Sequence, residues 1–185
     1  MTGTQRIVDL AEQPASILDQ AATLLSEGFD DPRPWPTFAA AGDEVNHVIR
    51  EGFARGLIED GQLLGWIGGL REYDGHVWEL HPLVVHRHRR RGGIGRALVA
   101  AFESEARRRG GITATVGTDD EAGMTSLGNV DLYDDVPRRI AELRDLGKQH
   151  PFLFYQRLGY VVTGVLPDAN GWGRPDIFMS KRLAD

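Results

Sequence analysis

A glycine-rich turn next to a run of basic residues is the first feature of the sequence that could bind a ligand. The basic run 86–91 leads into the glycines of 92–95, and the apolar periodicity of a helix follows over 94–109. A helix N-terminus presents unpaired N–H groups and partial positive charge, and glycines let a phosphate reach the backbone. The turn therefore predicts a site for a pyrophosphate.

The spacing of this turn separates it from two common nucleotide-binding motifs. It lacks the G-x-G-x-x-G of dinucleotide-binding folds and the Gly-Lys-Ser/Thr of phosphate-binding loops. The pattern that is present is Arg90-x-x-Gly93-x-Gly95, preceded by an apolar run over 80–85 that is typical of a buried strand. The alternative is a turn that only joins a strand to a helix.

Candidate acid–base residues lie on the strand that leads into the turn. Because side chains alternate along a strand, Glu79, His81 and Leu83 share one face, unless Pro82 marks a bulge. A carboxylate and an imidazole beside a phosphate site are suited to proton transfer. The alternatives are a surface carboxylate and a structural histidine.

A second candidate proton donor lies near the C-terminus, in Phe154-Tyr155-x-x-Leu158-Gly159-Tyr160. The phenol of Tyr155 can donate a proton to a leaving group such as a thiolate. The alternative is aromatic core packing.

Acidic residues gather in the stretch 119–145, which suggests a site for a cation. Asp119 and Asp120 follow a predicted strand, where ligands of open α/β sheets collect. Asp135, Asp176 and the strand residue Glu79 could add negative charge, and Trp35, on a proline-rich loop, could cover a ligand. The alternative is a solvated surface, the usual fate of charged runs.

Length and composition limit the function classes. The chain has 185 residues, no cysteine and a net charge of −6, with no apolar run of the roughly 18 residues that span a membrane. Cysteine nucleophiles and thiolate metal sites are excluded, and net acidity argues against nucleic acid as the main partner. Without a recognisable signal peptide, we expect one cytoplasmic domain over 1–185 that contacts no membrane and binds no metal.

The predicted elements describe an α/β domain with a mixed sheet. Asp60-Gly61 marks a hairpin, and three successive strands joined by tight turns imply an antiparallel meander. The strand–helix–strand order around 94–109 predicts one parallel pair. Helices are expected at 15–27, 43–55, 94–109, 135–146 and 151–158, and strands at 57–59, 63–71, 76–85, 112–117, 159–166 and 176–183.

The glycine turn and the Tyr155 motif together resemble the GCN5-related N-acetyltransferase (GNAT) superfamily. Further segments are similar to aminoglycoside 6′-N-acetyltransferases, and the likeness runs from about Trp78 to Arg182. These segments are WELHPLVV at 78–85, GTDD at 117–120, DLY at 131–133, GVLPDANGW at 164–172 and PDI at 175–177.

The resemblance implies a GNAT fold, with a mixed, mostly antiparallel sheet whose central parallel strands splay apart and are flanked by helices. It implies acetyl-CoA as co-substrate, direct attack by the amine of an aminoglycoside, and a homodimer. Strand 77–85 would hold the pantetheine arm and the turn would hold the pyrophosphate. The cofactor-binding residues implied are Leu83, Val84, Val85, Arg90, Arg91, Gly92, Gly93, Ile94, Gly95, Arg96 and Tyr155.

Chemical roles follow from the transfer that the resemblance implies. Glu79, with His81 nearby, is the candidate to position and deprotonate the amine, with a role in binding alone as the alternative, and Tyr155 would protonate the departing thiolate. The backbone N–H near Leu83 would polarise the thioester carbonyl. Because aminoglycosides carry several ammonium groups, the expected substrate-binding residues are Trp35, Glu79, Asp119, Asp120, Asp135 and Asp176.

Two other functions stay open at this point. One keeps acetyl-CoA but transfers the acetyl group to a polyamine, a metabolite amine or a protein N-terminus. The other is a module that binds RNA or anionic partners through the basic run, although the run lacks the interleaved aromatic residues typical of such modules.

Overall fold

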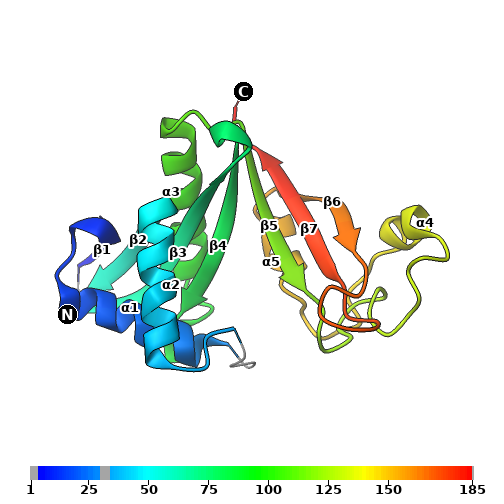
Figure 1. The fold of residues 1–185 in the computed structure, drawn as a ribbon, viewed down its shortest axis with the longest axis horizontal. Helices are drawn as coiled ribbons and strands as arrows, with labels where there is room; N and C mark the ends of the chain where they lie inside the picture. Colours follow the sequence, from blue (N-terminus) through cyan, green and yellow to red (C-terminus); the bar gives the residue numbers. More distant parts are fainter. Residues whose placement is uncertain (1–3, 30–33, 185) are drawn as a thin grey trace. The chain divides into compact units, whose positions relative to one another are not determined.

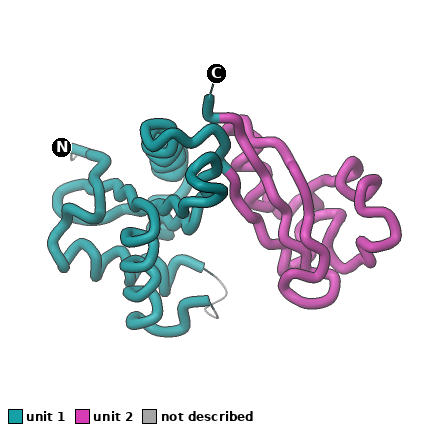
Figure 2. The backbone as a smooth tube through the Cα atoms, turned by 45° about the horizontal axis from the view of Figure 1, so that its top comes forward, with its two compact units in different colours: residues 1–114, 183–185 teal, residues 115–182 magenta. Residues whose placement is uncertain are grey.

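The computed structural model describes residues 4–29 and 34–184 and divides them into two compact units (Figure 2). Unit 1 holds the described residues up to Ala114 together with Leu183 and Ala184, and unit 2 spans Thr115–Arg182. Residues 30–33 of the predicted proline-rich loop lie outside the described residues. The expectation of a single domain stays a prediction.

Unit 1 contains four strands and three α-helices (Figure 1). The strands follow the order β1-β2-β3-β4, and each neighbouring pair is antiparallel. Short 3-10 turns at Leu10–Glu12, Tyr73–Gly75 and Arg87–Arg89 connect some of them. The elements are β1 (Gln5–Asp9), α1 (Ala15–Gly28), α2 (Phe38–Glu51), β2 (Gly52–Glu59), β3 (Gln62–Glu72), β4 (Val77–Val85) and α3 (Ile94–Arg108).

The predicted meander and its hairpin are confirmed, and the bulge left open at Pro82 is present. Asp60 and Gly61 have φ values of 51° and 81°, as the two-residue turns that join twisted strands require. Along β3 and β4, Ile67 pairs with Leu83 and Gly69 with Leu80, so the register shifts around the cis bond before Pro82. Pro82 therefore marks a bulge, as its place within a strand suggested.

Glycines in β3 let helices pack against both faces of this sheet. A Cβ on Gly68 would meet a side-chain atom of Val48 in α2 at 2.4 Å, whereas one on Gly69 would meet Phe102 of α3 at 2.9 Å. Because side chains alternate along the strand, α2 and α3 cover opposite faces (Figure 1).

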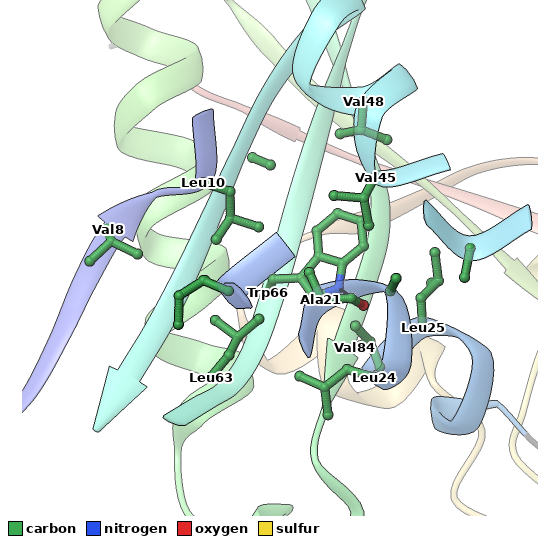
Figure 3. Close-up of a cluster of buried hydrophobic side chains, with 14 of the residues drawn as sticks. Val8, Leu10, Ala21, Leu24, Leu25, Val45, Val48, Leu63, Trp66 and Val84 are labelled. Carbon is green, nitrogen blue, oxygen red and sulfur yellow. Dashed lines mark hydrogen bonds between the residues drawn. The ribbon is translucent and has the colours of Figure 1, made fainter. Parts of the chain in front are cut away.

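Trp66 of β3 lies at the centre of the core under α1 and α2 (Figure 3). Its indole is fully buried and donates a hydrogen bond to the Ala21 carbonyl in α1 at 3.1 Å. The surrounding apolar side chains fix the positions of α1, α2 and β4, and β4 carries the candidate acid–base residues.

A buried carboxylate ties α3 to the strands of unit 1. Glu105 accepts hydrogen bonds from Arg108 and Arg109, and it lies 2.8 Å from Arg55 of β2. The Arg108 hydrogen bond is the main cause that holds the pKa of Glu105 well below its usual range. This network is structural: it joins the last turn of α3 to β2.

Unit 2 combines three strands with two short helices. Its strands follow the order β5-β7-β6, and β6 and β7 are antiparallel. A small core forms around Leu127, Leu132 and Ile177. The elements are β5 (Thr113–Asp119), which begins at the end of unit 1, α4 (Val136–Ala141), α5 (Phe152–Arg157), β6 (Val161–Leu166) and β7 (Asp176–Arg182).

Three parts of the local structure differ from the prediction. The helix expected over 43–55 runs from Phe38 to Glu51 with Thr37 as its N-cap, because Gly52 ends it and Phe53 enters β2. The strand β1 was not predicted, and the helix expected over 135–146 is shorter, at Val136–Ala141.

The predicted fold class is confirmed: an α/β fold with a mostly antiparallel sheet flanked by helices. Within the described parts of the chain, none of the helices has the length and hydropathy needed to cross a bilayer.

Candidate functional site

The predicted face of β4 is present for Glu79 and His81 but not for Leu83. Glu79 pairs with Leu70 and His81 lies beside Glu44 of α2, so both face the side that α2 covers. After the bulge at Pro82, Val84 is the residue that packs in the core under α1 and α2. Leu83, its neighbour, therefore faces the other side of the sheet, and the exception stated for a bulge at Pro82 applies.

Glu79 lies beside a hollow of about 420 Å³ within unit 1. Burial raises the pKa of its carboxyl; the charge of His81 opposes the rise and that of Glu72 adds to it. A raised pKa brings a carboxylate closer to a base that works near neutral pH. The hollow is lined by Glu79 together with His47, Glu51, Leu70, Arg71 and Glu72.

His81 is held between a carboxylate and an aromatic ring. Its Nε2 atom lies 3.4 Å from Oε1 of Glu44 in α2. The Trp35 ring centroid lies 5.9 Å from the imidazole, and Trp35 itself packs on the core and on Phe29. The structure thus brings together the predicted residues Trp35 and His81, and it adds a partner that we had not predicted.

The glycine turn has the geometry expected of an anion-binding helix start. Gly93 is the N-cap of α3 with φ 86°, a conformation that favours glycine, and no side chain caps the helix. Gly92 and Gly93 are exposed, and a Cβ on Gly93 would meet nothing within 4 Å. The first N–H groups of α3 are thus accessible to a phosphate, which fits the pyrophosphate of coenzyme A.

The arginines of the turn differ in what they contact. Arg90 donates hydrogen bonds to the carbonyls of Val85 at 3.2 Å and Gly28 at 2.5 Å, which ties the turn to β4 and α1. Arg91 and Arg96 are exposed. Arg90 therefore shapes the turn, whereas Arg91 and Arg96 stay the cations that could face a phosphate.

Tyr155 belongs to α5 in unit 2 and is buried among aromatic rings. The centroids of Phe154 and Tyr160 lie 5.1 Å and 5.6 Å from that of Tyr155. Burial raises the pKa of the phenol, so Tyr155 keeps its proton at neutral pH. A protonated phenol is the state that a proton donor requires.

Asp119 and Asp120, neighbours in sequence, have different environments. Asp120 is fully buried and accepts hydrogen bonds from the Met124 N–H at 2.5 Å and the Thr125 N–H at 2.8 Å. Its second oxygen also accepts from the Thr125 hydroxyl at 2.7 Å. Asp119 is exposed at the end of β5, where it accepts a hydrogen bond from the Asn170 amide at 2.5 Å. This favours a structural role for Asp120.

The other predicted acidic residues also have local contacts. Asp135 caps α4 by accepting from the Arg138 N–H at 3.1 Å, and its second oxygen lies 3.3 Å from the Arg138 guanidinium. Asp176 lies over Gly117, where a Cβ would come within 2.6 Å of the carboxylate, so this glycine makes room for Asp176. These residues belong to unit 2, as Tyr155 does.

Sequence reasoning missed Glu44, His47 and Glu51 of α2. They occupy positions i, i+3 and i+7, next to the buried stripe of Ala41, Val45 and Val48. Polar titratable residues at that spacing lie on one side of a helix, and this signal was available in the sequence. Across residues 4–29 and 34–184, no cluster of three or more His, Asp or Glu side chains is arranged to hold a metal.

Comparison with known proteins supports the resemblance. Residues 16–127 match the model of the acetyltransferase (GNAT) family. No curated protein matched the chain.

Solved structures match along nearly the whole chain. An aminoglycoside 6′-N-acetyltransferase complexed with coenzyme A is 37% identical, with 97% of this chain and 98% of that chain covered and a TM-score of 0.88. The aminoglycoside 6′-N-acetyltransferase from Enterococcus faecium is 37% identical over the same shares, with a TM-score of 0.87. An aminoglycoside 6′-acetyltransferase type Ii is 34% identical over the same shares, with a TM-score of 0.75. The chain therefore belongs to the GNAT family of acetyltransferases.

Proposed function

We propose that this acetyltransferase transfers the acetyl group of acetyl-CoA to the 6′-amine of aminoglycosides. The observation that carries the proposal is the likeness to aminoglycoside 6′-N-acetyltransferases at 34–37% identity over 97% of the chain. The carboxylates around the hollow beside Glu79 support it, because aminoglycosides carry several ammonium groups.

In the proposed reaction the amine attacks the thioester directly. An ammonium group must first lose a proton, and Glu79, whose pKa is raised, takes it directly or through a water molecule. The amine nitrogen then forms a bond to the acetyl carbon. The N–H near Leu83 stabilises the charge that develops on the carbonyl oxygen.

The carbon–sulfur bond then breaks, and the thiolate of coenzyme A leaves with a proton from Tyr155. The buried phenol holds this proton until the thiolate develops. The nitrogen loses its second proton to solvent as the amide forms, and the Tyr155 phenolate regains a proton from solvent. Val84 and Val85 would serve the pantetheine arm through the backbone of β4. The uncapped first turn of α3, with Gly92, Ile94, Gly95 and the exposed arginines, would hold the pyrophosphate.

For the acceptor, Glu79 and Asp119 are the proposed carboxylate contacts, with Trp35 beside the sugar rings. Asp176 and Asp135 would contribute charge at longer range, and Asp120 would support the turn that follows β5. Acetylation converts a charged amine into a neutral amide, which removes a cation from the drug and would confer antibiotic resistance. We further propose that the enzyme is a cytoplasmic homodimer.

An acetyl-transfer assay with a panel of amines tests the proposal. Release of free coenzyme A is measured with kanamycin-like and gentamicin-like aminoglycosides, with polyamines and with peptides that have a free N-terminus. We expect kcat/KM for the aminoglycosides to exceed that for the other amines by at least about 100-fold. Comparable values for a polyamine or a peptide would contradict the acceptor assignment and leave acetyl-CoA chemistry intact.

A further inference from the structure

The imidazole of His81 contacts Glu44 and Trp35, two residues that take no part in the proton transfer proposed for Glu79. Nε2 of His81 lies 3.4 Å from a carboxylate oxygen of Glu44, and the Trp35 ring lies at a centroid distance of 5.9 Å. These partners come from α2 and from the loop before it, not from β4. Two elements besides its own strand thus restrict the ring.

Glu44 is itself held in place by its helix. Val45 and Val48 of α2 are fully buried in the core around Trp66, so the helix cannot shift without disturbing this packing. The Glu44 side chain is 22% exposed, against 37% for His81. A partly buried carboxylate on a fixed helix gives the imidazole a defined partner.

A carboxylate beside one ring nitrogen selects the tautomer of a neutral histidine. The proton is favoured on the nitrogen that faces the carboxylate, and the other nitrogen keeps its lone pair. Catalytic bases are commonly oriented by a third group in this manner. In His81 the proton would reside on Nε2, which leaves Nδ1 as an acceptor for the water or amine that Glu79 deprotonates.

We propose that Glu44 is a positioning residue that fixes the ring orientation and the Nε2–H tautomer of His81. The expected effect of Glu44 on kcat rests on the proposed function, whereas the coupling between Glu44 and His81 does not. Glu44 contacts no reacting atom in this scheme and acts only through His81.

A double-mutant cycle with Glu44→Ala and His81→Ala tests the kinetic consequence. We expect Glu44→Ala to lower kcat by about 10-fold, the lower end for partners that orient a functional histidine, with KM for both substrates within about twofold. In the His81→Ala background the same change should lower kcat by less than about twofold. Asp43→Ala removes an exposed carboxylate one residue away on α2 and should leave kcat unchanged.

Several outcomes would overturn the inference. An unchanged kcat in Glu44→Ala or in His81→Ala would overturn it. So would an equal fall in kcat caused by Glu44→Ala in the wild-type protein and in the His81→Ala variant. A higher KM for the amine with an unchanged kcat would make Glu44 a substrate contact instead. Thermal melts that match those of the wild-type protein show that the variants are folded.

Nitrogen-15 NMR of the imidazole provides a readout that does not depend on turnover. The His81 signal, assigned by its loss in His81→Ala, should show the Nε2–H tautomer in the wild-type protein and a tautomer mixture in Glu44→Ala. An identical tautomer in both proteins would overturn the inference. If the wild-type enzyme acetylates no aminoglycoside, the proposed function fails, and the NMR result still decides whether Glu44 orients His81.

Discussion

The carboxylates near β4 and those of the stretch 119–145 differ in what they contact. Around Glu79, the side chains of Glu51 and Glu72 line a hollow. In the stretch 119–145, Asp120 and Asp145 each accept hydrogen bonds from backbone N–H groups of nearby residues. Both regions are acidic in sequence, but Glu51, Glu72 and Glu79 line a hollow, whereas Asp120 and Asp145 bind backbone N–H groups of their own loops.

The difference shows why an acidic run is weak evidence for a cation site. Asp145 accepts from the N–H groups of His150, Gln149 and Gly147, and these hydrogen bonds hold its pKa below the usual range. Such a carboxylate keeps its charge, but its oxygens are already used. We therefore expect recognition of an aminoglycoside to depend more on carboxylates of unit 1 than on those of 119–145, among which the exposed Asp119 is expected to make a small contribution.

Asp120→Asn should give the largest effect and act on stability. The amide would place an NH₂ group against the N–H donor of either Met124 or Thr125 in a buried site, at a cost of about 3 kcal/mol. Unfolding in denaturant measures it, and Asp119→Asn is the matched control, expected within about 0.5 kcal/mol of the wild type. Equal stability of the two variants would contradict a structural role for Asp120.

Tyr155→Phe should lower kcat by about 10–100-fold with little change in KM for acetyl-CoA. Phenylalanine retains the packing against Phe154 and Tyr160 and removes only the proton donor. This variant sharpens the comparison between the two regions, because it tests whether unit 2 contributes a phenol to the reaction. Wild-type kcat, with the chemical step shown to limit turnover, would assign Tyr155 to the core.

Glu79→Gln should lower kcat/KM by about 10-fold and change its pH profile. The base must be deprotonated and its pKa is raised, so wild-type activity should fall as the pH drops through a value above the usual carboxyl pKa of about 4.3. The glutamine variant should lose this acidic limb. If the limb persists in the variant, another group is the base and Glu79 only binds the amine.

Asp119→Asn should have the smallest effect, about a threefold rise in KM for the drug at unchanged KM for acetyl-CoA. Its carboxylate is exposed, and exposed charge pairs are worth little. Glu51→Gln, at the hollow, should raise this KM at least as much if the contrast between the two regions holds. Steady-state kinetics with both substrates decides, and a larger effect at Asp119 would reverse the contrast.

Local signals in the sequence predicted most of the fold. The apolar stripe of α3, the Asp60-Gly61 hairpin and the bulge at Pro82 each depend on residues close in the chain, and each is present. The start of α2 was misplaced at residue 43, whereas Thr37 caps a helix that begins at Phe38. Strand β1 was missed because it is mostly exposed and depends on pairing with distant β2.

The candidate site was predictable where one strand or one turn carries it, as with Glu79, His81 and the glycine turn. What could not be predicted depends on long-range packing. The approach of Glu44 to His81 needs α2 to lie on the sheet, and the burial of Asp120 needs the fold of the loop after β5. Neighbouring aspartates with opposite environments look identical in sequence.

A matched pair of aminoglycosides that differ only at the 6′ position tests the central claim most directly. One member carries a 6′-amine and the other a 6′-hydroxyl, and each is incubated with the enzyme and acetyl-CoA. The account predicts that only the 6′-amine compound is acetylated, with NMR of the product locating the acetyl group on the 6′-nitrogen. Equal acetylation of both compounds, or acetylation of neither, would contradict the account.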